Sequence, residues 1–278
     1  MLTLLRGRLV VVAGAAISGL AAARALAELG ARVLVCDDSA QRLATLPDGC
    51  EPAAGLTAVP ATTALVVTSP GWRPDNPLLR SALDTGIEVI GEPELAWRWT
   101  LAGGPGEGRA PRWWAVTGTN GKTTTVGMLE SILTCAGRDA VACGNVGTPV
   151  IDAVRAGRRE LVVELSSFQL HWSPSLRPDG GCLLNVAEDH LDWHGGMPAY
   201  LAAKEQTLTG AVAVAGIDDP VVAAALARCP APSKVGLTLG EPSEGRFGVL
   251  EGVLTDNAFG AGPLALLGAG EIRPAGSP

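Results

Sequence analysis

The residues best suited to chemistry lie in one short run that contains two glycines: Gly118, Thr119, Asn120, Gly121, Lys122, Thr123 and Thr124. Glycines let the backbone bend until its N–H groups face a bound phosphate, and a helix that follows adds positive charge at its N-terminus. In such a loop Lys122 neutralises phosphate oxygens as a point charge, and Thr123 offers a hydroxyl to Mg²⁺. The run therefore predicts a site for the phosphates of a nucleoside triphosphate.

This loop departs from the commonest phosphate-binding pattern. The pattern G-x-x-x-x-G-K-[ST] requires a glycine at position 116, where the chain has Val116, so the run is a shorter variant. A glycine-rich turn with a chance lysine is the alternative. Apolar residues 113–117 before the run indicate a strand, and residues 123–136 after it indicate a helix. These neighbours favour the phosphate loop.

Three further positions carry groups that could act on phosphates or metals. Glu164 ends an expected strand at 161–165, where parallel sheets often place a metal-ligating carboxylate, although a helix cap or an ion pair is the alternative. His190 lies among acids in residues 185–194, either as a ligand or as part of a solvated loop. Lys204 taken alone is typical of a surface lysine in a helical ion pair. The oxygen-rich set suits Mg²⁺ better than zinc.

A second glycine turn lies near the N-terminus, at residues 14–19. A dinucleotide-binding turn would have glycine in place of Ala16, because the backbone there approaches a pyrophosphate. Asp37, at the end of the next expected strand, could hold a ribose hydroxyl. A plain turn between a strand and a helix is the alternative. We expect a nucleotide at this turn, but not NAD.

The elements expected around these residues alternate between short apolar strands and helices, which indicates an α/β fold with parallel sheets. Residues 1–100 are expected to form a Rossmann-like domain, 101–111 a Gly/Pro-rich linker, and 112–278 a central domain of the phosphate-loop type. The expected strands are 9–13, 32–36, 65–68, 87–90, 113–117, 139–143, 161–165, 182–185 and 211–215. The expected helices are 18–29, 76–85, 92–100, 123–136, 148–155, 198–208 and 220–228. Beyond about residue 240 the pattern thins, and no element is assigned.

Composition limits the classes of partner. The 278 residues carry a formal charge of −7 with no basic run, which argues against binding nucleic acid through its phosphates. The six cysteines form no C-x-x-C pair and follow no secretory signal, so we expect reduced thiols in a cytoplasmic protein. The longest uncharged stretch, residues 9–23, is shorter than the roughly 20 apolar residues of a membrane span, so no membrane partner is expected.

In their order along the chain, these runs resemble the Mur ligase family, the ATP-dependent amino-acid ligases of cell-wall peptide synthesis. The runs are G-T-N-G-K-T at 118–123, G-N-V-G at 144–147, E-L-S-S-F-Q-L at 164–170, N-V-A-E-D-H-L-D at 185–192 and A-A-K at 202–204. The run at 164–170 is similar to the branch of the family that adds D-glutamate to UDP-N-acetylmuramoyl-L-alanine. The resemblance covers residues 1–240.

The resemblance implies a reaction and a set of residue roles. ATP would phosphorylate the carboxylate of UDP-N-acetylmuramoyl-L-alanine, and the amine of D-glutamate would attack the acyl phosphate. The catalytic residues would be Lys122, His190 and Lys204. One Mg²⁺ would be held by Thr123 and Glu164. A second Mg²⁺ would be held by His190 and by Lys204 in the form of a carbamate. The residues facing the substrate would be Ile17, Ser18, Asp37, Gly71, Asn145 and Ser166, with the first four holding UDP.

Two departures from the family pattern shape the remaining expectations. Relatives commonly have glycine where Ala16 stands, and they have a third, C-terminal domain that helps to hold ATP and D-glutamate. We therefore expect this chain to lack that domain, to have an incomplete central domain and to be inactive by itself. A non-catalytic nucleotide-binding remnant is the alternative. An oxidoreductase that binds its dinucleotide at residues 14–19 would leave residues 118–204 unexplained. The run at 166–169 disfavours a folate polyglutamate ligase.

Overall fold

Two compact units make up the chain in the computed structural model, which describes residues 5–104 and 110–272. The first unit comprises Met1–Pro111, Cys143–Arg159 and Phe168–Ser175, and the second comprises Arg112–Ala142, Glu160–Ser167 and Leu176–Pro278. The first unit is therefore discontinuous, whereas the expected bounds 1–100 and 112–278 are continuous stretches. Residues 105–109 of the expected linker and the last six residues lie outside the described residues.

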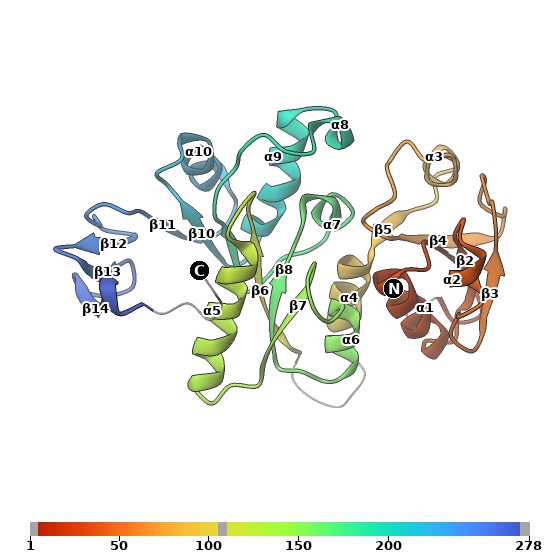
Figure 1. The fold of residues 1–278 in the computed structure, drawn as a ribbon, viewed down its shortest axis with the longest axis horizontal. Helices are drawn as coiled ribbons and strands as arrows, with labels where there is room; N and C mark the ends of the chain where they lie inside the picture. The colour runs from red at the N-terminus through yellow and green to blue at the C-terminus, as the bar shows by residue number, and fades with distance from the viewer. Residues whose placement is uncertain (1–4, 105–109, 273–278) are drawn as a thin grey trace. The chain divides into compact units, whose positions relative to one another are not determined.

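The first unit contains a five-stranded sheet with the order β3-β2-β1-β4-β5, of which Figure 1 labels β2, β3, β4 and β5. All of its neighbouring strands pair in parallel, and this order is that of a Rossmann-like fold. The strands are β1 (Leu9–Ala13), β2 (Arg32–Cys36), β3 (Cys50–Ala53), β4 (Thr63–Thr68) and β5 (Val89–Gly91). The helices are α1 (Ile17–Glu28), α2 (Ala40–Leu43), α3 (Pro77–Asp84), α4 (Glu92–Leu101), α6 (Val150–Arg155) and, largely, α7 (Ser167–His171).

The turn between β1 and α1 depends on two glycines. Gly14 has φ +105°, a conformation that side chains disfavour. A Cβ on Gly19 would lie 1.8 Å from the carbonyl oxygen of Gly14, so α1 can start this close to the turn only because position 19 has no side chain. The glycines at 14 and 19 therefore serve the packing of the helix against the turn, whatever the turn binds.

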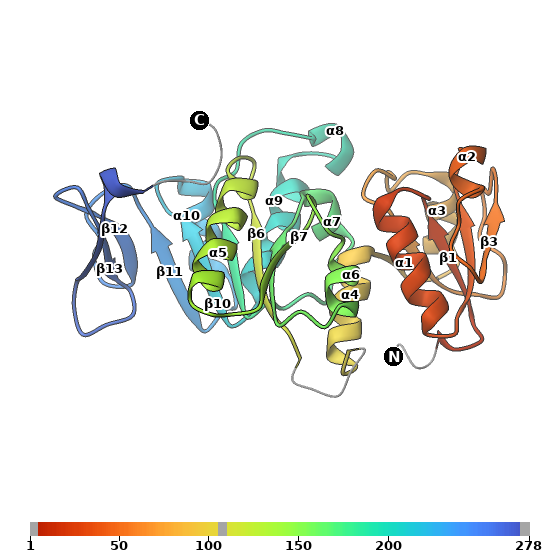
Figure 2. The ribbon, with the colours of Figure 1, turned by 60° about the horizontal axis from the view of Figure 1, so that its bottom comes forward.

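The second unit contains a nine-stranded sheet, in which β6 lies between β8 and β9. Figure 2 labels β6, β7, β10, β11, β12 and β13 of this sheet. The order of the strands is β7-β8-β6-β9-β10-β11-β12-β13-β14. The strands are β6 (Arg112–Thr117), β7 (Ala140–Gly144), β8 (Glu160–Glu164), β9 (Gly180–Leu183), β10 (Val212–Gly216), β11 (Ser233–Leu237), β12 (Arg246–Leu250), β13 (Val253–Asn257) and β14 (Leu264–Gly268). The helices are α5 (Lys122–Cys135), α8 (Leu191–His194), α9 (Met197–Glu205) and α10 (Pro220–Arg228), with 3₁₀ turns η2 (Gln206–Thr209) and η3 (Ala269–Glu271).

Strands β8, β6, β9, β10, β11 and β12 pair in parallel, so their carboxyl ends share one edge. Apolar side chains such as Val116 and Val162 pack with Val126 of α5 on this sheet. The predicted α/β fold with parallel sheets is confirmed. Within the described ranges, no helix is both long and apolar enough to cross a membrane.

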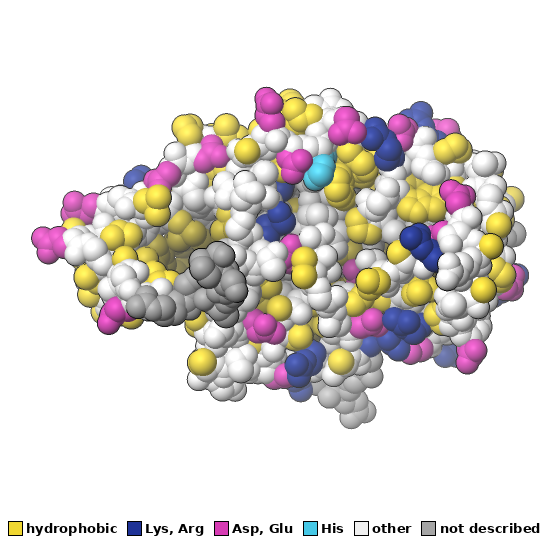
Figure 3. Space-filling view, viewed as in Figure 1, with side chains coloured by type: hydrophobic (Ala, Val, Ile, Leu, Met, Phe, Trp, Pro, Cys, Tyr) yellow, Lys and Arg dark blue, Asp and Glu magenta, His cyan; other side chains and the backbone are white. Residues whose placement is uncertain are grey.

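The expectation that the pattern of elements thins beyond residue 240 is wrong. Strands β12, β13 and β14 follow there and pair as an antiparallel meander. Each strand is only five residues long, and β14 exposes Leu264, Leu266 and Leu267, so no alternation of buried and exposed residues marks it in the sequence. On the face drawn in Figure 3, hydrophobic side chains and acidic side chains both lie over this meander.

Candidate functional site

The run 118–124 forms the loop between β6 and α5, at the carboxyl end of a central strand. Gly121 directly precedes α5 and has φ +82°, which a residue with a side chain would adopt only with strain. No side chain caps the N-terminus of this 14-residue helix, and the side chains of Thr123 and Thr124 are exposed. The first turn of α5 therefore offers N–H groups and hydroxyls to a ligand.

Two lysine ammonium groups converge on this loop. Lys122 Nζ donates to the carbonyl oxygens of Gly118 and Thr119, both at 3.0 Å. Lys204 Nζ, from α9, donates to the same Gly118 oxygen at 2.8 Å. Lys204 is only 2% exposed, so the alternative of a surface lysine is wrong. Lys122 and Lys204 are 82 positions apart in the sequence. In the fold, both ammonium groups donate to the Gly118 carbonyl oxygen.

The electrostatics of Lys204 are unusual for a lysine. Burial, with a smaller contribution from the charge of Lys122, lowers its pKa from 10.5 to about 7, and Asp189 opposes the shift. The ammonium also lies 4.7 Å from the centre of the Tyr200 ring, a cation–π arrangement that favours the charged form. Near neutral pH, both the charged and the neutral amine are therefore populated.

The loop after β9 holds the glycine loop in place. The side-chain amide of Asn185 accepts from the Asn120 backbone N–H at 2.9 Å and donates to the Asn120 carbonyl oxygen at 3.2 Å. Thr119 N–H donates to the Asn185 carbonyl oxygen at 3.1 Å. The Thr119 hydroxyl lies 3.0 Å from the Tyr200 hydroxyl and accepts from the Ala187 N–H at 2.9 Å. Both backbone and side chains therefore fix the phosphate loop.

Asn185 and Tyr200 are site residues that the sequence analysis did not select. Asn185 was assigned to the end of a strand, and the structure ends β9 at Leu183, which frees Asn185 for the loop. Tyr200 is the one tyrosine of the chain and lies four residues before Lys204 on α9. That spacing places the two side chains on the same face of the helix. It was the feature of the sequence that could have linked Tyr200 to Lys204.

Glu164 lies at the carboxyl end of β8, directly beside β6. It pairs with Val116 in the sheet register and is 2% exposed. The Thr117 hydroxyl donates to the Leu165 carbonyl oxygen at 2.8 Å, which ties the two strand ends together. Ser166 follows and is half-buried. The structure thus places Glu164 and Ser166 at the sheet edge from which the phosphate loop starts.

His190 occupies the position before α8 with φ +51°, a left-handed conformation that is rare for a residue with a side chain. Its Nε2 lies 3.3 Å from Asp189 Oδ2, and its side chain is about half exposed. Within the described ranges, no three His, Cys, Asp or Glu side chains are grouped to hold a metal ion. A few oxygen donors such as Thr123 and Glu164 fit Mg²⁺, which usually takes its other ligands from phosphates and water.

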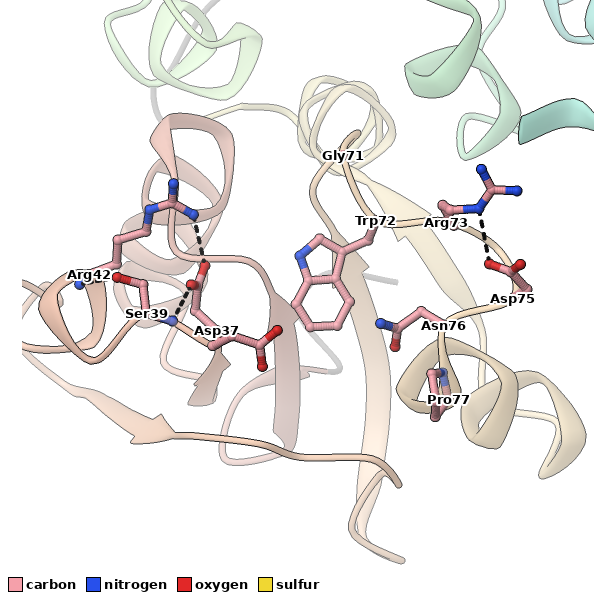
Figure 4. A pocket seen from close by; sticks show the side chains of 10 residues that line it. Asp37, Ser39, Arg42, Gly71, Trp72, Arg73, Asp75, Asn76 and Pro77 are labelled. Atoms are coloured by element: carbon pink, nitrogen blue, oxygen red, sulfur yellow. Dashed lines mark hydrogen bonds and ion pairs between the residues drawn. The ribbon is translucent and has the colours of Figure 1, made fainter. Parts of the chain in front are cut away.

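In the first unit, a pocket of about 780 Å³ opens at the carboxyl ends of β2 and β4 (Figure 4). Its lining includes Asp37 and Gly71, but not Ile17 or Ser18, which begin α1 with Ile17 72% exposed. The full lining is Asp37, Asp38, Ser39, Arg42, Gly71, Trp72, Arg73, Asp75, Asn76 and Pro77. The pocket therefore gathers part of the predicted UDP-binding set.

Asp37 organises the floor of this pocket. Its two oxygens accept from the backbone N–H groups of Ala15 at 2.7 Å and Ser39 at 2.8 Å. Burial would raise the pKa of Asp37, but these donors and the Arg42 guanidinium hold it below its ordinary value. Asp37 is therefore ionised and joins the turn after β1 to the turn after β2.

Asn145, also in the first unit, lies on the exposed loop between β7 and α6. The Gly144 N–H donates to the Thr148 carbonyl oxygen at 2.9 Å and closes this loop. Behind it, Glu92 Oε1 accepts from the Ile151 N–H at 2.6 Å, and Glu92 is 1% exposed. Burial raises the pKa of Glu92 from 4.5 to about 8, against the bond from Ile151. A buried carboxyl thus anchors the helix that follows the Asn145 loop.

Comparisons with known proteins match two family models to this chain. Residues 116–244 match the model of the Mur ligase middle domain, and residues 8–91 match that of the MurD-like N-terminal domain. The chain belongs to the Mur ligase family. Its fold is similar to a Mur-family structure, the UDP-N-acetylmuramate:L-alanyl-gamma-D-glutamyl-meso-diaminopimelate ligase from Neisseria meningitides, with a TM-score of 0.55 and 19% identity over 94% of this chain and 84% of that one.

Similarity in sequence is higher to one group of Mur ligases. The chain is 50% identical to the UDP-N-acetylmuramoylalanine--D-glutamate ligase of Nocardia farcinica, over 99% of this chain and 58% of that protein. It is 52% identical to the enzyme of the same name from Mycolicibacterium vanbaalenii, over 97% of this chain and 56% of that protein. The chain therefore spans little more than half the length of these Mur ligases.

Proposed function

We propose that this Mur ligase chain serves an ATP-dependent ligation of D-glutamate to UDP-N-acetylmuramoyl-L-alanine in the synthesis of peptidoglycan precursors. The γ-phosphate of ATP passes to the substrate carboxylate, which gives an acyl phosphate and ADP. The amine of D-glutamate then attacks the acyl carbon, an amide forms, and phosphate leaves. Phosphorylation is needed because a carboxylate has no good leaving group of its own.

One observation carries the proposal: the loop at residues 118–124 presents Lys122 and an uncapped helix N-terminus at the carboxyl end of β6. This is the arrangement that holds nucleotide phosphates. The 50% identity to D-glutamate ligases over nearly the whole chain supports the choice of substrates.

Lys122 and the backbone of the loop would bind the phosphates. The carbonyl oxygens of Gly118 and Thr119 hold the Lys122 ammonium at the loop, so its charge is in position before a ligand arrives. Asn185 and Tyr200 would keep the loop in one conformation, because they bond Asn120 and Thr119. Fixed donors of this kind stabilise the charge that develops as the phosphoryl group moves between two anions.

Thr123 and Glu164 would hold a Mg²⁺ that shields the phosphate charge. His190 and Lys204 would serve a second ion beside the acyl phosphate. The lowered pKa of Lys204 supports its carbamylation, since the neutral amine is the form that bonds to the carbon of CO₂ and loses a proton. The resulting carbamate would replace a positive charge by oxygen ligands, which Mg²⁺ prefers.

The first unit would bind the uridine diphosphate part of the substrate in the pocket after β2 and β4. Asp37 and Gly71 line that pocket, and Ile17 and Ser18 would contact the substrate from the start of α1. Asn145 and Ser166 would face the muramoyl and amino-acid parts of the substrate. The cofactors in this proposal are ATP and Mg²⁺, and the partners are the two small-molecule substrates in the cytoplasm.

Calorimetric titration with a non-hydrolysable ATP analogue and Mg²⁺ tests the proposal. Lys122→Ala should weaken binding by about tenfold to a hundredfold, the loss expected when a charged hydrogen bond of about 1.5–3 kcal/mol is removed. Lys234→Ala is the matched control, because Lys234 lies on β11 and its Nζ bonds to the Ala227 carbonyl oxygen. Equal affinity in wild type and Lys122→Ala would refute the phosphate loop.

A further inference from the structure

We propose that Trp72 is the platform on which the uracil base of the nucleotide substrate stacks. The inference rests on the proposed function, because it concerns how the first unit would hold a uridine nucleotide. Trp72 carries the aromatic ring among the residues that line the 780 Å³ pocket. In Figure 4 its indole projects between two pocket walls, one with Asp37, Ser39 and Arg42 and the other with Asp75 and Asn76.

The exposure of Trp72 sets it apart from tryptophans that build the protein core. Trp97, Trp99, Trp113 and Trp172 are buried, whereas Trp72 is only partly buried. Among the described residues, no ring contact or side-chain hydrogen bond of Trp72 is found. A partly exposed indole without such contacts is available to a planar ligand, and a nucleobase is planar with a π face on either side.

Trp72 lies in a turn that holds its backbone beside the pocket. Trp72 follows β4, and its N–H donates to the Ser69 carbonyl oxygen at 3.1 Å in a tight turn. A Cβ on Gly14 would lie 3.0 Å from Trp72 Nε1 and 2.6 Å from the Ser69 hydroxyl oxygen. The nitrogen edge of the indole therefore lies against the glycine turn after β1.

The rest of the pocket complements the other parts of a uridine diphosphate. Arg42 and Arg73 line it with side chains that are 57% and 45% exposed, so guanidinium groups are present for the two phosphates. The carboxylate of Asp38 and the hydroxyl of Ser39 offer acceptors to N–H and O–H groups of a base or ribose. The pocket thus combines one apolar platform with cationic and polar groups, as a nucleotide requires.

Titration of the chain with UDP, followed by calorimetry and by tryptophan fluorescence, tests the inference. Stacking of one base on an aromatic side chain is worth about 1–3 kcal/mol, so Trp72→Leu should weaken UDP binding by about fivefold to a hundredfold. Trp72→Phe keeps an aromatic face and should bind within about threefold of wild type. UDP should change the tryptophan fluorescence of the wild type but not that of Trp72→Phe. Phe259→Leu, which alters an exposed ring outside the pocket, should behave as wild type.

The outcomes separate this inference from the proposed function. If the wild type binds UDP and Trp72→Leu binds equally well, stacking on Trp72 is refuted while the uridine site stands. If Trp72→Leu does not fold, the fluorescence of Trp72→Phe decides: a UDP-induced change as large as that of wild type refutes the inference. If the wild type does not bind UDP, both the uridine site of the proposed function and the inference fail.

Discussion

Glu92 offers a direct test of how the buried carboxyl behind the Asn145 loop behaves. Its side chain is 1% exposed and accepts from the Ile151 N–H at 2.6 Å. The perturbation is Glu92→Gln, which keeps an oxygen for Ile151 and nearly the same volume but cannot ionise. We expect this variant to gain stability relative to wild type as the pH rises.

The size of the effect follows from the pKa of Glu92, which burial raises from 4.5 to about 8. Because the folded-state pKa is the higher one, the folded protein holds a proton that the unfolded chain releases between these values. The stability that the protonated carboxyl contributes is complete below pH 4.5 and is lost as the pH rises through 8. Between pH 5.5 and 7.5 the loss is about 2.5 kcal/mol, at 1.36 kcal/mol for each pH unit of full proton difference.

Urea unfolding of wild type and Glu92→Gln at pH 5.5 and 7.5 measures this loss. The stability difference between variant and wild type should shift by about 2.5 kcal/mol in favour of the variant at the higher pH. Glu241→Gln, at an exposed glutamate, reports the pH dependence that does not arise from burial. The same stability difference between Glu92→Gln and wild type at both pH values would show that Glu92 is ionised in the folded protein and would refute the reasoning.

Two further predictions concern the second unit. In an active ligase that contains this chain, Lys204→Ala should abolish ADP formation, and short-chain carboxylates should restore part of it by occupying the position of the carbamate. Wild-type turnover in the variant would refute the role of Lys204 at the second metal ion. Glu160 is 4% exposed and accepts from Trp114 Nε1 at 2.7 Å as well as from two arginines. Glu160→Gln should therefore lower the free energy of unfolding in urea by about 3 kcal/mol, and a loss below about 1 kcal/mol would contradict this role of a buried ion pair.

The sequence predicted well those parts of the fold that rest on local signals. The strands of the parallel sheets are nearly continuous apolar runs because both of their faces are buried, as in β1 and β8. Helices α3 and α10 begin with Asn76-Pro77 and Asp219-Pro220, where the first side chain caps the helix and proline fits its first turn. Such signals need no knowledge of tertiary structure.

The elements that the sequence did not predict depend on tertiary context. Strand β3 contains a proline and has no fully buried residue, so its composition does not favour a strand. The four-residue helix α8 begins after His190 in a left-handed conformation, without a capping side chain. The meander β12–β14 is held by antiparallel pairing between short segments, which propensity alone does not reveal.

The candidate site also contains one part with a local sequence signal and other parts that depend on tertiary contacts. The predicted phosphate loop is a contiguous run, so its residue types were sufficient to raise that prediction, which stays a prediction. The bonds from Asn185 to Asn120 and from Lys204 to Gly118 join residues 65 and 86 positions apart. Only the packing of β9 and α9 beside β6 brings these groups together. Taken alone, Lys204 is typical of a surface lysine, and only the family resemblance assigns it to a metal site; the structure places it in the interior.

The discontinuity of the first unit has a consequence for how the chain is made. Glu92 receives its hydrogen bond from Ile151, the Gly91 N–H donates to the Trp172 carbonyl oxygen at 2.8 Å, and Glu94 bonds to Ser175. A ribosome that has released only residues 1–111 has not yet supplied these three partners. Buried polar groups without partners are costly. The packing of α4 is therefore complete only after residue 175 has been synthesised. Synthesis of this protein thus couples completion of the first unit to the appearance of the strands that carry the phosphate loop.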